Sequence, residues 1–209
     1  MHFQPADLQG MSRFYRANLI NCLSGHKPAM LVGTANAEGA TNLALFSNIF
    51  HLGADPALIG YVQRPVGQSG DTYRNIEATG VYTFNFVPHE WLERAHYTSA
   101  RFAPDQSEFD ACGFETEWVD GFAAPFVKGS PVRIGLRMAD RIPYPRNGTT
   151  LVIGAVEHIL VDEALMMADG NINFEAAALL SVAGLEQYFL PRLLRQMPYA
   201  KVENTPARS

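Results

Sequence analysis

The chain has 209 residues, 47% of them hydrophobic, and a net charge of −5 at neutral pH. That length favours one domain over 1–209, with an arm at 1–10 and a partly flexible tail at 195–209. No basic stripe suits nucleic acid, no apolar run approaches the ~20 residues of a membrane span, and Cys22 and Cys112 lack disulfide or metal spacing. We therefore expect a cytoplasmic protein that binds neither nucleic acid nor a membrane.

The first third of the chain is typical of a strand meander. Residues 29–35 and 57–63 are apolar runs, and turn signals follow or precede them at 36–39 and at Asp55-Pro56. The segment 41–50 lies between them and carries Asn42, Ser47 and Asn48, where a plain buried strand would stay apolar. Short polar side chains in such a place either satisfy the backbone locally or face a polar ligand.

The rest of the chain alternates further strands with short helices. Strands are expected at 81–87, 114–118, 131–138 and 149–161, and helices at 72–78 after an Asp71 cap, 89–98, 107–112 and 173–181. Residues 64–70, 104–106 and 142–148 are predicted as loops, the last an irregular Pro-rich excursion, while 13–20 fits a helix or a strand. This pattern predicts a mainly β fold, a Greek-key β-barrel with attached helices.

Several motifs resemble, in order, the flavin reductase-like family of FMN-binding split barrels, the flavoredoxin type. The residues that carry the resemblance are Gly39, Asn42, Ser47 to Phe50, Asp55-Pro56, Arg64-Pro65, Asp71-Thr72, Asn75-Ile76, Asn85, Thr98 to Ala100, Ser107 to Phe109, and Gly184 to Tyr188. The resemblance implies a split β-barrel, a homodimer with the flavin at the subunit junction, FMN as cofactor with FAD as the alternative, and NAD(P)H as co-substrate.

The resemblance also implies a set of cofactor-binding residues. Arg64 precedes a proline at a strand end and is the phosphate candidate, helped by Thr72 in the first turn of a helix. Irregular backbone at 44–48 would match the ring edge, with Ser47 or Asn48 donating to it. The complete set is Thr34, Asn42, Leu45, Phe46, Ser47, Asn48, Arg64, Thr72, Asn75, Asn85, Ser99 and Ala100. A surface role for Arg64 and structural pairing for Asn85 are the alternatives.

No side chain is expected to act as an obligatory acid or base, because a flavin itself carries hydride and electrons. The sequence therefore predicts an NAD(P)H-dependent flavoprotein oxidoreductase, with a non-enzymatic flavin carrier as the alternative. A third hypothesis is a metal-dependent hydrolase, since His89, Glu93 and His96 fall on one face of a predicted helix. Gly184 to Tyr188 either closes over the flavin or belongs to a C-terminal helix packed on the barrel.

Overall fold

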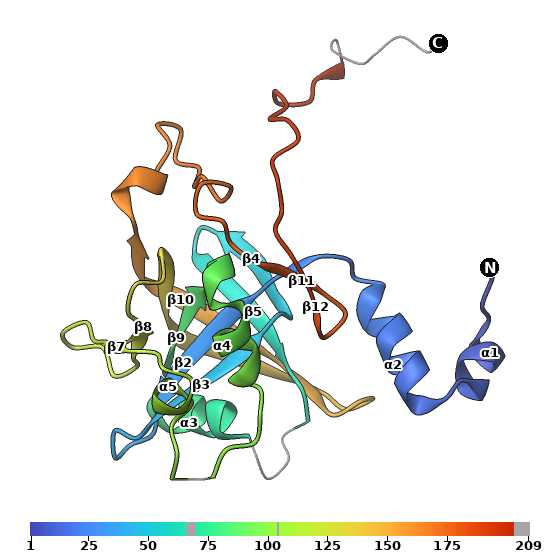
Figure 1. Ribbon diagram of the computed structural model, residues 1–209, viewed down its shortest axis with the longest axis horizontal. Helices are drawn as coiled ribbons and strands as arrows, with labels where there is room; N and C mark the ends of the chain where they lie inside the picture. Colours follow the sequence, from blue (N-terminus) through green and yellow to red (C-terminus); the bar gives the residue numbers. More distant parts are fainter. Residues whose placement is uncertain (66–69, 104, 203–209) are drawn as a thin grey trace.

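The computed structural model describes residues 1–65, 70–103 and 105–202. Its frame is a seven-stranded antiparallel sheet in the order β3-β2-β6-β9-β10-β5-β4 (Figure 1). The strands are β2 (Met30–Ala35), β3 (Thr41–Phe46), β4 (Ile49–Ala54), β5 (Ala57–Gln63), β6 (Val81–Phe86), β9 (Val132–Tyr144) and β10 (Thr149–Val161). β3 and β4 are opposite edges of this sheet, yet only Ser47 and Asn48 separate them in the chain. The sheet therefore curls into a barrel that stays split at this junction.

The two faces of the sheet bury different clusters because side chains alternate along each strand. Met30 and Val32 join Tyr82 and Phe84 in one cluster, whereas Leu31 on the opposite face packs with residues of the attached helices. Thr83 and Asn85 share the second face of β6, and both are fully buried. The expected mainly β barrel is confirmed.

Short helices and two small sheets surround the barrel. The helices are α1 (Pro5–Gly10), α2 (Arg13–Cys22), α3 (Asp71–Thr79), η1 (His89–Trp91), α4 (Leu92–Tyr97), α5 (Glu108–Ala111) and η2 (Glu163–Leu165). The small sheets are β1 (Lys27–Pro28), β11 (Ser181–Ala183) and β12 (Gln187–Phe189), and β7 (Thr116–Glu117) with β8 (Phe126–Val127). Within the described residues, no helix combines the length and apolar character needed to cross a membrane.

Residues 1–22 and 190–202 lie beside the barrel rather than on it (Figure 1). The expected arm at 1–10 contains α1, and 13–20 belongs to the helix α2; neither helix has a buried residue. Residues 190–202 are exposed and lead away from β12. The end of the predicted tail, 203–209, and parts of the predicted loops, 66–69 and 104, lie outside the described residues.

The helix expected over 173–181 is wrong. Asn173 Oδ1 does accept a hydrogen bond from Ala176 N at 3.0 Å, but only one turn follows. Ala178 then takes a φ of 48°, and Leu179 bridges to Pro88 on the barrel. Tertiary pairing of the backbone has replaced the helix that the local signals favoured.

The Pro-rich excursion expected at 142–148 is also wrong at its start. Ile142 to Tyr144 continue β9 and pair with Leu151 to Thr149 of β10, so only a turn remains. β6 pairs with β9 no further than Arg137, which leaves this part of β9 at an edge, where the missing N–H of Pro143 is tolerated.

The start of α3 is shifted by one residue from the expectation. Gly70 is the N-cap, and Asp71 is the first helical residue instead of the cap. Asp71 Oδ1 instead pairs with Arg74 Nη2 at 3.2 Å. An acidic side chain in the first turn of a helix is still favourable for the helix dipole.

Candidate functional site

A cavity of about 350 Å³ opens at the split of the barrel. One wall is formed by the end of β3, the β3–β4 junction and the end of β5, and the other by α4 and the β11–β12 hairpin. The lining residues are Leu45, Phe46, Ser47, Asn48, Val62, Gln63, Arg64, His96, Ser99, Val182, Leu185, Glu186 and Tyr188. Such a volume falls in the range of small-molecule sites, and the mixture of apolar walls with a few polar groups is typical of them.

The β3–β4 junction is irregular over fewer residues than expected. β3 pairs regularly with β2 as far as Phe46, so the backbone from Ala44 to Phe46 is ordinary strand, which corrects the irregularity expected there. Beyond it, Asn48 O accepts a hydrogen bond from Val62 N at 2.9 Å, which joins the junction to β5. Within the described residues, the side chains of Ser47 and Asn48 make no hydrogen bond, so their polar atoms are available to a ligand.

The β11–β12 hairpin forms the far wall of the cavity. Gly184 turns it with a φ of 62°, in the left-handed region that favours glycine. β11 pairs with β1, which attaches the hairpin to the rest of the molecule. Leu185, Glu186 and Tyr188 of this hairpin line the cavity, and the alternative of a C-terminal helix is wrong.

Tyr188 reaches across the cavity wall to α4. Its hydroxyl lies 2.9 Å from His96 Nδ1, and the two rings meet edge to face with centroids 5.7 Å apart. Burial, and then the charge of Glu186, raise the pKa of Tyr188, so its hydroxyl keeps its proton at neutral pH. Sequence reasoning missed His96 as a cavity residue, because the contact joins positions 92 residues apart.

Two cations stand next to each other beside the cavity. Arg64 Nη2 donates to Asn21 Oδ1 at 3.3 Å, and Lys27 Nζ donates to Asn21 O at 3.4 Å. Burial, and then the neighbouring Arg64 charge, lower the pKa of Lys27. No carboxylate in the described parts of the chain forms an ion pair with either cation. Two neighbouring cations without a partner anion would attract a phosphate to this side of the cavity.

Four further predicted residues meet elsewhere, where α3 packs on β2 and β3. Asn42 Nδ2 donates to Thr72 Oγ1 at 2.9 Å, and Asn75 Nδ2 donates to Thr34 Oγ1 at 3.1 Å. These contacts hold the helix to the strands. Asn42 and Asn75 also line a second, polar cavity of about 370 Å³, together with several carboxylates that make it a poor place for a phosphate.

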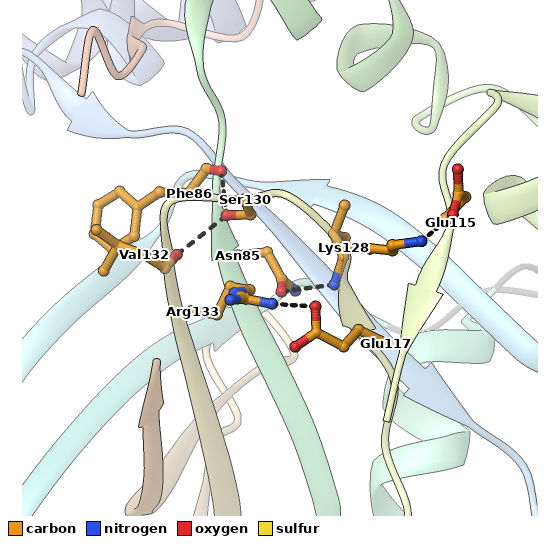
Figure 2. A network of polar contacts seen from close by, with 9 residues as sticks. Asn85, Phe86, Glu115, Glu117, Lys128, Ser130, Val132 and Arg133 are labelled. Carbon is orange, nitrogen blue, oxygen red and sulfur yellow. Dashed lines mark hydrogen bonds and ion pairs between the residues drawn. The ribbon is translucent and has the colours of Figure 1, made fainter. Parts of the chain in front are cut away.

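Asn85 lies inside a buried polar network next to β8 (Figure 2). Its Nδ2 donates to Leu31 O at 3.1 Å and Thr83 Oγ1 at 2.9 Å, while its Oδ1 accepts from Val127 N at 2.9 Å. The protein itself thus uses both the donors and the acceptor of this amide, which favours the structural alternative. Of the last two predicted residues, Ser99 lines the first cavity and Ala100 is exposed outside its lining.

The metal hypothesis finds no geometric support. His96 is bound to Tyr188, and His89 Nδ1 lies 3.4 Å from its neighbour Glu90. Across 1–65, 70–103 and 105–202, no group of three or more His, Cys, Asp or Glu side chains is arranged to hold a metal ion. His89, Glu93 and His96 therefore do not form the hydrolase site considered from the sequence.

Comparison with known structures gives the same fold over nearly the whole chain. A split-barrel protein from Shewanella frigidimarina, named only provisionally as a flavin reductase, is 39% identical with a TM-score of 0.92, covering 96% of this chain and all of that one. Nitrilotriacetate monooxygenase component B from Bacillus cereus is 22% identical with a TM-score of 0.83, covering 94% and 98%. The second likeness, at its low identity, concerns the fold alone.

Sequence comparison identifies the family of this chain. An uncharacterized protein of Halalkalibacterium halodurans, BH2278, is 29% identical over 156 residues, covering 72% of this chain and 74% of its own. The family model described as the flavin reductase like domain matches residues 24–176, which contain the barrel, the β3–β4 junction and α4. With that match and the 39% identical split barrel, the chain belongs to the flavin reductase-like family.

Proposed function

We propose that this protein binds FMN in the cavity at the split of the barrel and transfers electrons from NADH or NADPH through it to an acceptor. The observation that carries the proposal is the cavity of about 350 Å³, which Arg64 lines, with Lys27 next to Arg64 on the same residue, Asn21. Bound flavin supplies hydride and electron transfer, so the chain's own task is to bind, orient and shield it.

The wall composition fits a flat ring with a polar edge. Leu45, Phe46 and Val62 offer apolar surface on the barrel side, while Ser47 and Asn48 offer unused polar atoms. Gln63 Oε1 is buried with no hydrogen-bond partner in the described residues. An unsatisfied buried acceptor costs about 1–3 kcal/mol, a cost that an N–H donor of a bound ring would remove after a small rotation of the amide.

The pair of cations beside the cavity, Arg64 and Lys27, fits the phosphate of a mononucleotide. Arg64 offers paired N–H donors, and Lys27 adds a second charge close by. A phosphate between them would relieve the repulsion that contributes to the lowered pKa of Lys27. We further propose that the active form is a homodimer, since α2, which holds Asn21 beside Arg64, buries no residue within its own chain.

The first test is the visible spectrum of the purified protein, with the flavin identified by chromatography and NADH and NADPH oxidation followed at 340 nm. We expect close to one FMN per chain and oxidation of at least one nicotinamide. FMN binding without nicotinamide oxidation would support the alternative, a non-enzymatic flavin carrier. A protein that binds neither FMN nor FAD would overturn the proposal.

The second test addresses the phosphate. Arg64→Ala should weaken FMN binding by about tenfold to a hundredfold, because a charge-assisted hydrogen bond is worth roughly 1.5–3 kcal/mol. Lys128→Ala is the matched control, since it removes the same charge from an exposed pair with Glu115. Equal affinities for the two variants would place the phosphate elsewhere.

A further inference from the structure

His96 is distinct among the groups that line the cavity. Arg64, Glu186 and Tyr188 also line it, but histidine is the side-chain type suited to give and take a proton near neutral pH. His96 lies on α4 and is half-buried. Its Nδ1 is engaged by Tyr188, and within the described residues its Nε2 makes no hydrogen bond. Nε2 is therefore the nitrogen left for a ligand.

The contact with Tyr188 survives a change in protonation of the imidazole. In the neutral ring with its proton on Nε2, the tyrosine hydroxyl donates to Nδ1. In the imidazolium, Nδ1–H donates to the same hydroxyl oxygen instead. When the imidazolium loses its Nε2 proton, the product keeps the Nδ1–H bond, so no atom other than the transferred hydrogen has to move. Tyr188, half-buried and protonated, is thus suited to position His96.

The charges around His96 come from three elements. The β11–β12 hairpin contributes Glu186 and Tyr188, the end of β5 contributes Arg64, and α4 itself contributes Tyr97, whose ring lies 5.6 Å from that of His96.

We propose that His96 is a catalytic acid for acceptors that need a proton together with a hydride, and that Tyr188 is its positioning residue. This inference rests on the proposed flavin function, and a conjugated carbonyl compound, whose reduction needs both a hydride and a proton, is the probe that tests it. The enone accepts a hydride from reduced flavin at its β-carbon, and the C=C π pair shifts to leave an enolate oxygen. The Nε2 proton of His96 then forms the O–H bond. The acceptor gains two electrons, the flavin loses two, and solvent returns the proton to His96.

The test compares two acceptors of the FMN-loaded, NAD(P)H-reduced protein, cyclopent-2-enone and ferricyanide. Ferricyanide takes electrons without a proton, so the ratio of the enone rate to the ferricyanide rate isolates the contribution of the acid catalyst. General acids contribute roughly 10²–10⁴-fold, so we expect His96→Gln to lower this ratio about 100-fold and Tyr188→Phe about tenfold. His89→Gln, on η1 and outside the cavity lining, is the matched control and should leave the ratio at the wild-type value.

A readout without flavin tests the positioning. In ¹⁵N spectra of the flavin-free protein, the Nδ1 signal of His96 should have the shift of a hydrogen-bonded ring nitrogen, and Tyr188→Phe should remove that shift. Equal loss of both rates in His96→Gln, an unchanged Nδ1 signal in Tyr188→Phe, or a wild-type protein that reduces ferricyanide but no enone would each overturn the proposal. A wild-type protein that binds no flavin would overturn the proposed function and this assignment with it.

Discussion

Glu108 places a carboxylate beside the polar cavity, where its Oε2 accepts a hydrogen bond from Leu43 N at 3.1 Å. Desolvation raises its pKa, with a smaller contribution from the charge of Asp71, although the backbone hydrogen bonds oppose them. The folded state then holds this proton more tightly than the unfolded state, whose pKa is about 4.3. The free energy of unfolding should therefore fall as pH rises from that value through the raised folded pKa, and this contribution levels off above it.

Glu108→Gln keeps an acceptor oxygen for Leu43 N and removes the desolvated charge. We expect a higher free energy of unfolding at pH 7 and a flatter profile from about pH 4 to 7, measured by urea denaturation. Glu38→Gln, at an exposed turn, serves as the control. Parallel profiles for wild type and Glu108→Gln would contradict the assignment.

Asn85 and Asn48 are both predicted site residues, but their side chains lie in different environments. Asn85→Ala removes three hydrogen bonds and leaves the buried Val127 N–H unsatisfied, so we expect a loss of about 2–4 kcal/mol in the free energy of unfolding. Asn48→Ala should change stability by less than about 0.5 kcal/mol and instead weaken FMN binding. Urea denaturation and flavin titration of both variants check this; equal stability losses would mean that the two amides play the same part.

The sequence could not separate these two asparagines. Each stands in an apolar segment with strand character, and each was assigned to the cofactor site. What decides their roles is a distant partner: the acceptor of Asn85 meets a backbone N–H 42 residues further along the chain. His96 escaped prediction as a cavity residue for the same reason, since its neighbour Tyr188 belongs to a hairpin whose position depends on pairing with β1.

At the scale of elements, β2 and β8 approach each other closely because Gly33 has no side chain. A Cβ at position 33 would lie 2.3 Å from Pro125 O and 2.6 Å from Thr83 Oγ1, and backbone cannot give way as a flexible side chain does. We expect Gly33→Ala to lower the free energy of unfolding by about 3 kcal/mol. Gly10→Ala, with no atom within 4 Å of the added Cβ, is the control. Urea denaturation that finds the two variants equally stable would refute the close contact.

Elements marked by apolar runs were predictable, and those shaped by pairing were not. The apolar runs at 29–35, 57–63 and 149–161 form strands close to the expected bounds, because an apolar run bounded by turn signals is local information. The segments at 142–148 and 173–181 were misjudged, because hydrogen bonds with β10, and with Val87 and His89 on either side of Pro88, outweigh the proline and capping signals there.

At the scale of the whole molecule, the order of strands follows from contacts that no local pattern encodes. β6 joins β2 to β9, and β10 joins β9 to β5, so the sheet is closed by pairings between distant segments. Composition and periodicity predicted strands and turns, and the resemblance in motif order supplied their arrangement. The cavity arises only from that arrangement, since one wall comes from residues 45–64 and the other from residues as far along the chain as Tyr188.

The surface of α2 argues for a second copy of the chain. This ten-residue helix buries none of its residues, and Phe14 (78% exposed) and Tyr15 (57%) project large apolar groups into solvent. Helices shorter than about 12–15 residues are marginal in water without tertiary packing, and clustered exposed apolar side chains mark interaction surfaces. Since Asn21 of α2 bonds Arg64, burying this helix in a dimer would also fix the proposed phosphate site.

Phe14→Glu should therefore convert the proposed dimer to monomers and weaken FMN binding at least tenfold, because a charge cannot be buried there without a partner. Sedimentation velocity measures the first effect and flavin titration the second. Asn18→Glu, which adds the same charge at an exposed polar position of the same helix, is the control and should remain dimeric. A Phe14→Glu protein that stays dimeric would show that α2 is not part of the interface. A monomeric variant with full FMN affinity would show that each chain completes its flavin site alone.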